Sequence, residues 1–255
     1  MSYVDFLRES IEDSIRRVEQ DLQWIEENAP RIAETLIDHA VDQQWWLPQW
    51  GKDELKERLT GDVAQFVTTP LTENARLIRT CLAQVRAGLA YVGSPDTLRA
   101  AADRIDDGVV SSSQELAPTL VLGNIPSSST SNWSDDEASD GYVRKIDGRS
   151  EAVQTGSENA ATVATGLRNS AKNIEDFLIA LAELVAGLVG VVAGIVTAIV
   201  GAATVVLLIA GIVGAIAGVA SLVAGIVKLI SSTGQGVDEA LRNLSPEIHP
   251  WIEVF

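Results

Sequence analysis

Hydrophobic residues recur every three or four positions along most of the chain, which is the period of an amphipathic α-helix. No segment shows the steady alternation of a half-buried strand, so the pattern predicts helices throughout. Over residues 11–36 the spacing between successive hydrophobic residues alternates between four and three, as along the hydrophobic seam of a heptad repeat. The hydrophobic positions of this seam are Ile11, Ile15, Val18, Leu22, Ile25, Ala29, Ile32 and Leu36.

Proline and other start or stop signals divide this region into predicted helices. Pro30 lies inside the first seam, where we expect a kink or a restart, and the first helix should end near Pro48. A second helical stretch covers roughly residues 53–66. Thr69 is expected to cap a third helix that has Pro70 at its first position. The apolar side of that helix carries Leu71, Ile78, Leu82, Val85, Leu89 and Val92.

The N-terminal group of amphipathic helices is predicted to occupy residues 1–108. Its last and shortest helix starts with Ser94-Pro95-Asp96, a cap followed by proline, and should fray by Asp106–Gly108. Residues 109–132 are rich in Ser, Pro and Gly and lack a steady period. They predict a long connection and the main domain boundary of the protein.

After this connection, a stalk helix is predicted over residues 133–183. Ser134 or Asp135 is the expected N-cap, and acidic residues in the first turn suit the helix dipole. Small side chains on the seam imply close approach to a neighbouring helix, and no stop signal separates the stalk from the segment that follows. The seam consists of Ile146, Ser150, Val153, Ser157, Ala160, Ala164, Leu167, Ala171, Ile174, Leu178 and Leu181.

An apolar segment of about 44 residues without a single charge follows the stalk. As one helix it would be about 66 Å long, against a hydrocarbon core of about 30 Å, so we expect two spans. Gly201 should end the first arm and Thr204 should cap the second. The predicted hairpin domain covers residues 184–230, and a C-terminal tail covers residues 231–255.

Small residues recur in both arms at steps of three and four, which places them in one stripe along each helix. Such stripes allow the backbones of two membrane helices to approach closely. Two antiparallel stripes of this spacing fit in level contact, although a slide of seven residues preserves the match. The stripes consist of Gly187, Gly190, Gly194, Thr197 and Gly201 in the first arm and Gly211, Gly214, Gly218, Ser221 and Gly225 in the second.

These patterns predict an all-α protein, an elongated helical bundle or coiled coil with a glycine-striped apolar helical hairpin. A membrane, an oligomer or the rest of the chain must cover this hairpin. We favour a bilayer, because about 23 Leu, Ile and Val residues in the segment favour transfer into lipid. The alternative is a soluble structural or adaptor bundle in which the helices of residues 4–107 enclose the hairpin as a core.

The net charge of −16 narrows the choice of partners. An acidic chain repels phosphates and anionic headgroups, which argues against a nucleic acid and against a basic membrane-binding patch. Any attraction to lipid must therefore be hydrophobic. The N-terminus lacks the basic and apolar regions of a cleaved signal peptide, so we expect any export to use another route.

Residues with catalytic or metal-binding chemistry are sparse. The chain has no nucleophile, zinc or phosphate-binding motif, so we expect no enzyme activity, no metal and no cofactor. His39 and His249 stand far apart, and the lone Cys81 is expected to be a small buried residue on a helix. Residues 136–147 match part of a calcium loop, but Ala138 occupies a ligand position, and a solvated acidic helical turn explains them better.

Several residues suit a membrane interface. Glu183 and Lys228 flank the apolar segment, and in a hairpin both lie at its open end, either at an interface or as solvated helix ends. Clustered tryptophans are either interfacial anchors or a local packing plug. The tryptophans in question are Trp45, Trp46, Trp50 and Trp251.

The start of the stalk carries Trp133, Ala138 and Tyr142 ahead of a long helix. Over residues 133–183 this arrangement resembles the Trp-x-Gly turn and second helix of the small helical-hairpin proteins exported by type VII (ESX) secretion systems. Asp135 stands where that family has glycine, and its export signature, Tyr-x-x-x-Asp/Glu, is not met. The resemblance implies a protein secreted without a cleaved signal peptide, and a helical secretion partner.

The combination of stalk helices with an apolar hairpin also resembles the α-helical pore-forming toxins of the cytolysin A type, although no motif is shared. This likeness implies a hydrophobic head that is hidden in solution and released on insertion. We therefore expect a non-enzymatic effector, pore-forming or anchoring protein that inserts its hairpin into a lipid bilayer and forms a homo-oligomer there.

Overall fold

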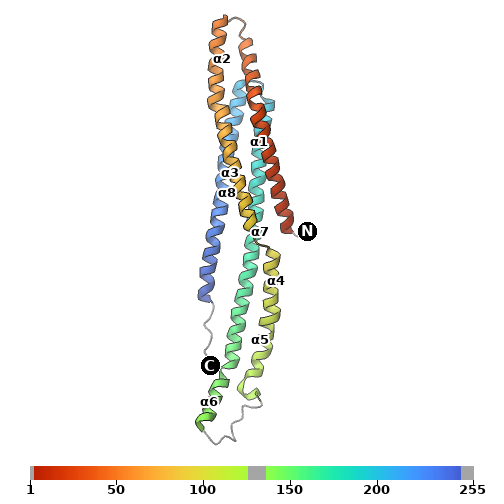
Figure 1. Ribbon diagram of the computed structural model, residues 1–255, viewed down its shortest axis with the longest axis vertical. Coiled ribbons are helices and arrows are strands. Elements are labelled where there is room, and N and C mark those ends of the chain that lie inside the picture. Colours follow the sequence, from red (N-terminus) through yellow and green to blue (C-terminus); the bar gives the residue numbers. More distant parts are fainter. Residues whose placement is uncertain (1–2, 126–135, 248–255) are drawn as a thin grey trace. The chain divides into compact units, whose positions relative to one another are not determined.

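The computed structural model describes residues 3–125 and 136–247, and within these ranges all regular structure is helical (Figure 1). The predicted all-α fold class is therefore confirmed. The described chain divides into two compact units, of which the first contains the segments up to Val92 and Asp176–Thr233. The remaining described residues, from Gly93 to Glu175 and from Gly234 onward, form the second unit.

Unit 1 is built from four helical rods. Two come from the N-terminal part of the chain, and two are the apolar ends of α7 and α8. The bounds are α1 Tyr3–Asp42, α2 Gln49–Val63, the π-helical segment η1 Ala64–Thr68, α3 Thr69–Tyr91, α7 Arg149–Gly201 and α8 Val205–Glu247. All four rods contribute large, fully buried side chains to one core: Ile11, Ile15, Ile78, Leu82, Leu178, Leu181, Leu188, Ile195, Ile199, Leu208, Ile212 and Ile226.

The first helix continues through Pro30, so the predicted restart is absent. The predicted seam is buried from Ile11 to Ala29, but Ile32 and Leu36 are only half-buried, and their assignment to the seam was wrong. A proline inside a helix removes one backbone hydrogen bond and crowds the preceding turn. Beyond it, the buried stripe advances in steps of four, which rotates it around a helix of 3.6 residues per turn. The buried residues there are Ala33, Ile37 and Val41.

The second and third predicted helices form one continuous run rather than two helices with a cap between them. The backbone is helical at Thr68 and Thr69, so the predicted cap at Thr69 was wrong. A π-turn places one extra residue in the run just before Pro70, which lacks the N–H of a regular turn. The hydroxyl of Thr68 donates to the carbonyl of Val63 at 3.2 Å and satisfies one carbonyl of this widened turn.

The predicted hairpin turn is confirmed. The arm in α7 ends at Gly201, and α8 begins at Val205. The Thr204 hydroxyl accepts the backbone N–H of Leu207 at 3.3 Å, and its carbonyl accepts that of Leu208 at 3.1 Å. Thr204 therefore caps the second arm as a threonine N-cap does.

Contacts across the hairpin define its register. Ideal Cβ positions on four stripe glycines lie 2.9–3.4 Å from a side chain of the other arm, and each step along α7 is matched by an equal step back along α8. The pairs are Gly187 with Leu222, Gly211 with Ala198, Gly218 with Val191 and Gly225 with Leu184. Each of these glycines thus receives a larger side chain, which fills space that level glycine stripes would leave empty.

The other half of the stripe faces away from the opposite arm. Ideal Cβ positions on Gly190, Gly194, Gly201 and Gly214 meet nothing within 4 Å. The expected glycine-to-glycine contact is therefore not the arrangement of the arms in this fold.

Two alanine substitutions test this register. Replacing a helical glycine by alanine stabilises a helix by about 0.5–1 kcal/mol, so Gly214→Ala should raise the free energy of unfolding by that amount. At Gly211 the new methyl group would lie 2.9 Å from the Ala198 Cβ atom, and overpacking of this kind costs about 1–3 kcal/mol. Gly211→Ala should therefore be less stable than Gly214→Ala in urea unfolding. Equal midpoints for the two variants would contradict the register.

Unit 2 contains more helix than predicted. Its elements are α4 Pro95–Ile105, the π-helical segment η2 Asp106–Val110, α5 Ser111–Leu116, the 3₁₀ segments η3 Ala117–Leu120 and η4 Leu122–Asn124, α6 Asp136–Asp147, the first part of α7 and the end of α8 from Gly234. The Ser94 hydroxyl accepts the N–H of Thr97 at 3.4 Å and caps α4 as predicted. Gly148 interrupts the expected continuous stalk and separates α6 from α7.

Residues 109–124, apart from Val121, are helical where the sequence predicted an irregular connection. The helix α4 ends at Ile105, directly before the predicted fraying point, but the chain continues as the π-helical segment η2 instead of fraying. Short π and 3₁₀ turns leave backbone carbonyls without the regular helical partner. Two serines of the predicted stalk seam supply donors: Ser150 to the Ala117 carbonyl at 2.8 Å and Ser157 to the Val110 carbonyl at 3.4 Å. This long-range packing stabilises a segment whose composition alone favours a loop.

Candidate membrane-insertion site

Two helices are long and apolar enough to cross a membrane. They are the helical run Glu137–Gly201, which includes α7, and the segment Val205–Ser232 of α8. In their most apolar windows only 28% and 22% of residues are buried. A core helix of a soluble protein is mostly buried, so these arms differ from the usual enclosed core helix.

The two arms have distinct inner and outer faces. The inner face carries large aliphatic residues of the unit 1 core: Val185, Leu188, Val192, Ile195 and Ile199 from α7, and Val205, Leu208, Ile212, Val219, Val223 and Ile226 from α8. The outer face is exposed, uncharged and rich in small residues: Ala186, Gly190, Gly194, Thr197, Ala210, Gly214, Ala217, Ala220, Ser221 and Ala224. Sequence periodicity alone did not reveal this division, because both faces are apolar.

Two of the three hydroxyl side chains in residues 184–227 have hydrogen-bond partners within the hairpin. The hydroxyl of Thr197 donates to the Ala193 carbonyl of its own helix at 2.9 Å. Thr204 caps the second arm, as described above. An apolar environment penalises an unpaired hydroxyl, and these two side chains have partners before any transfer into lipid.

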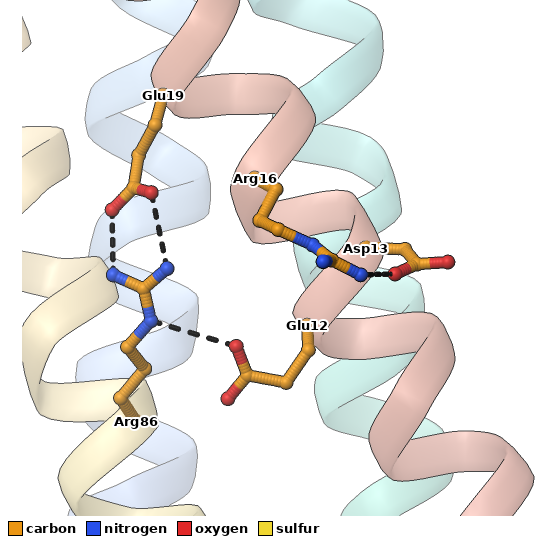
Figure 2. A network of polar contacts seen from close by, with 5 residues as sticks. All are labelled: Glu12, Asp13, Arg16, Glu19 and Arg86. Carbon is orange, nitrogen blue, oxygen red and sulfur yellow. Dashed lines mark hydrogen bonds and ion pairs between the residues drawn. The ribbon is translucent and has the colours of Figure 1, made fainter.

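Ion pairs bind α1 to α2 and α3. Arg86 of α3 contacts both carboxylate oxygens of Glu19, at 2.6 and 3.0 Å, and lies 3.5 Å from Glu12, while Arg16 pairs with Asp13 along α1 (Figure 2). These contacts are partly exposed, so each contributes about 0–1 kcal/mol and mainly sets how the helices pair.

Two further pairs extend this antiparallel arrangement. Arg79 forms a forked pair with Glu26 at 2.7 and 2.8 Å, and Lys56 of α2 lies 2.6 Å from Asp38. The hydrogen bond from Arg79 to Glu26 raises the pKa of the Arg79 guanidinium above its usual value. We call α1, α2, η1 and α3 together the helical sheath. Ion pairs link the helices of the sheath to one another, whereas the arms between residues 184 and 227 carry no charge and can form no ion pair with the sheath.

In unit 2, charge binds α7 directly to α4. Arg99 contacts both carboxylate oxygens of Glu175 at 2.6 Å. Arg168 lies 2.8 Å from Asp103 and 2.6 Å from Asp106. The polar part of α7 is thus fixed to its neighbours by ion pairs that its apolar part lacks.

The Arg99–Glu175 pair predicts a change of stability with pH. The hydrogen bond from Arg99 holds the pKa of Glu175 below its usual value, so the pair contributes stability above about pH 4.3 and loses it as the pH falls further. Thermal unfolding of Glu175→Gln should therefore show a lower midpoint than the parent at pH 7, with a difference that shrinks as the pH falls below about 4.3 and vanishes only below the lowered pKa of Glu175. Glu158→Gln, an exposed change on the same helix, is the control. A difference independent of pH would contradict the prediction.

The candidate interfacial residues are exposed where they are described. Trp45, Trp46 and Trp50 are 84%, 65% and 71% exposed, so they do not form a packing plug. Glu183 and Lys228 are also exposed and flank the open end of the hairpin. Trp251 and Trp133 lie outside the described residues. Ala138 and Tyr142 lie on α6, and the turn that carries the family resemblance is likewise outside the described ranges.

Other chemistry is limited in the described part of the chain. No group of three or more His, Cys, Asp or Glu residues there is arranged to hold a metal. Asp140, Gly141 and Asp147 lie in α6 and do not form a calcium loop. Cys81 is buried in unit 1, as predicted, and burial raises the pKa of its thiol. His39 is exposed on α1, and His249 lies outside the described residues.

Comparison with protein-family models, curated proteins and solved structures finds no match for this chain.

Proposed function

We propose that this protein inserts the α7–α8 hairpin into a lipid bilayer and that the soluble fold stores the hairpin until it meets one. The observation that carries the proposal is the pair of uncharged arms, each long enough to span a bilayer and each mostly unburied. A soluble protein seldom leaves a large apolar surface exposed without a binding partner for it.

Insertion requires the sheath to leave the inner face of the hairpin. About 23 Leu, Ile and Val residues of the arms each contribute about 0.3–0.6 kcal/mol on transfer to lipid, or about 7–14 kcal/mol together. This gain offsets the apolar packing that is lost when the sheath separates. No ion pair with residues 184–227 must break, because those residues carry no charge.

The proposed activity involves no catalysis, cofactor or metal. Small residues on the outer face suit close packing between helices in a membrane, so we propose that inserted hairpins form a homo-oligomer, either a pore or an anchor. The resemblance at the start of the stalk supports secretion without a cleaved signal peptide, with a helical partner in the secretion machinery.

A soluble structural or adaptor bundle is the second candidate. The observation that favours it is the common core, in which the inner face of the hairpin packs with α1 and α3. In that case the outer face binds another protein rather than lipid.

Flotation with liposomes separates the two candidates. The protein, prepared without detergent, is mixed with phosphatidylcholine vesicles beside a deletion variant that lacks residues 184–227. The proposal predicts that the intact protein floats, withstands an alkaline wash and releases a trapped dye if it forms a pore, while the deletion variant stays behind. If the intact protein stays a soluble monomer that does not bind vesicles and the deletion variant is unfolded, the hairpin is the core of a soluble bundle and the second candidate is supported.

A further inference from the structure

One end of unit 1 gathers exposed aromatic and aliphatic residues. Figure 1 shows the α1–α2 connection projecting beyond the α7–α8 turn, with both loops toward the same end of unit 1. The connection carries Trp45, Trp46 and Trp50, which are all largely exposed. Beside the turn, Val200, Val206 and Leu207 are 65%, 74% and 58% exposed. We call these six residues the apolar tip.

The apolar tip is uncharged in a strongly acidic protein. From Gln43 to Gly51 the sequence QQWWLPQWG has no charged residue, and neither does the turn from Gly201 to Thr204. The pair between Lys56 and Asp38 joins the two helices that lead to the connection. The tip therefore presents indole and aliphatic groups with no charged side chain among them, and charged residues begin only at Asp42 and Lys52.

We propose that the apolar tip docks on the interfacial region of an electrically neutral bilayer before the hairpin inserts. Indole has an apolar body and one N–H donor, and it prefers the headgroup zone, where one part is dry and the other is wet. A net charge of −16 makes anionic lipid an unfavourable target, and zwitterionic headgroups avoid that repulsion.

Docking at this end determines the direction of insertion. Because the α7–α8 turn is the end of the hairpin nearer to the α1–α2 connection, docking directs the turn, rather than the charged open end at Glu183 and Lys228, toward the lipid surface. The hairpin then enters turn first. This direction rests on the proposed function, whereas docking itself does not require insertion.

The experiment measures docking in a protein that does not insert. Gly194→Asp with Gly214→Asp places charges on the outer face of the arms, where added side chains meet open space. This variant is mixed with phosphatidylcholine vesicles whose acyl chains carry bromine, a quencher of tryptophan fluorescence. The proposal predicts reversible flotation and quenched emission. Adding Trp45→Ser, Trp46→Ser and Trp50→Ser should weaken vesicle binding at least tenfold and remove most of the quenching.

Tyr3→Ser with Phe6→Ser is the matched control, because these residues are 58% and 57% exposed at the opposite end of α1. Its binding should stay within twofold of the parent. Unchanged binding of the triple tryptophan variant, equal loss in the control, or a requirement for anionic phosphatidylglycerol would overturn the inference. Absence of binding to any vesicle by the parent would overturn it as well and would assign the tip to a protein partner.

The failures of the two proposals are distinguishable. If tryptophan-dependent docking occurs but the hairpin of the unmodified protein never crosses the bilayer, the tip docks and the insertion proposal fails. If the hairpin crosses equally fast without the three tryptophans, insertion stands and the docking proposal fails.

Discussion

Aspartates at both Gly194 and Gly214 should abolish insertion into vesicles while leaving the soluble fold intact. Both positions lie on the exposed outer face, and an added side chain meets nothing within 4 Å, so the soluble protein accommodates the charges. In a bilayer each aspartate near the middle of a span costs about 2.5–3.5 kcal/mol. Two such costs, if additive, reduce insertion by a factor of about 10⁴ or more. Resistance of bound protein to an alkaline wash measures insertion, and thermal unfolding measures the soluble fold.

The contrast with the inner face gives this prediction its control. Val192→Asp places a charge in the fully buried core of unit 1 and should unfold or strongly destabilise the soluble protein. Normal insertion of the double outer-face variant would show that the arms do not enter the hydrocarbon. Loss of its soluble fold would show instead that another part of the protein packs on the outer face.

Weakening the sheath should accelerate insertion. Ile15 is fully buried in the core that α1 shares with the hairpin, and Ile15→Ala should cost about 2–5 kcal/mol of stability through lost burial and a residual cavity. If the soluble fold is a stored state, the variant should insert at least tenfold faster, because separation of the sheath precedes insertion. Stopped-flow dye release and urea unfolding measure the two effects in parallel.

Leu77→Ala is the control for this variant. Leu77 is 44% exposed on α3, so its truncation removes apolar surface without opening the core, and both stability and insertion should change little. Slower insertion of Ile15→Ala, despite its lower stability, would mean that the sheath assists insertion rather than restraining it.

Local signals in the sequence predicted those parts of the fold that depend on neighbouring residues. The α1 seam up to Ala29, the cap at Ser94 and the hairpin turn between Gly201 and Thr204 all follow from spacing and capping chemistry. Each of these features is decided within one or two helical turns, so one segment contains the necessary information.

The features that were missed depend on contacts between distant segments. The mostly helical residues 109–124 receive hydrogen bonds from Ser150 and Ser157 of α7 at the carbonyls of Ala117 and Val110, contacts that the local sequence does not reveal. The glycine pattern fits more than one register, and the structure selects one in which a side chain such as Leu222 fills the space over Gly187. A tryptophan can pack inside the protein or project into solvent, and the local sequence of the α1–α2 connection is compatible with either arrangement.

A hairpin that crosses a bilayer turn first carries its turn to the far side, and chemical labelling of the turn reveals on which side it lies. Ala203 is exposed in the turn, and Ala203→Cys in a Cys81→Ala background provides a single thiol. With protein added outside phosphatidylcholine vesicles, the thiol should become unreactive to a membrane-impermeant maleimide outside and reactive to the same reagent trapped inside. Continued reaction from the outside, by protein that remains bound, would contradict the account.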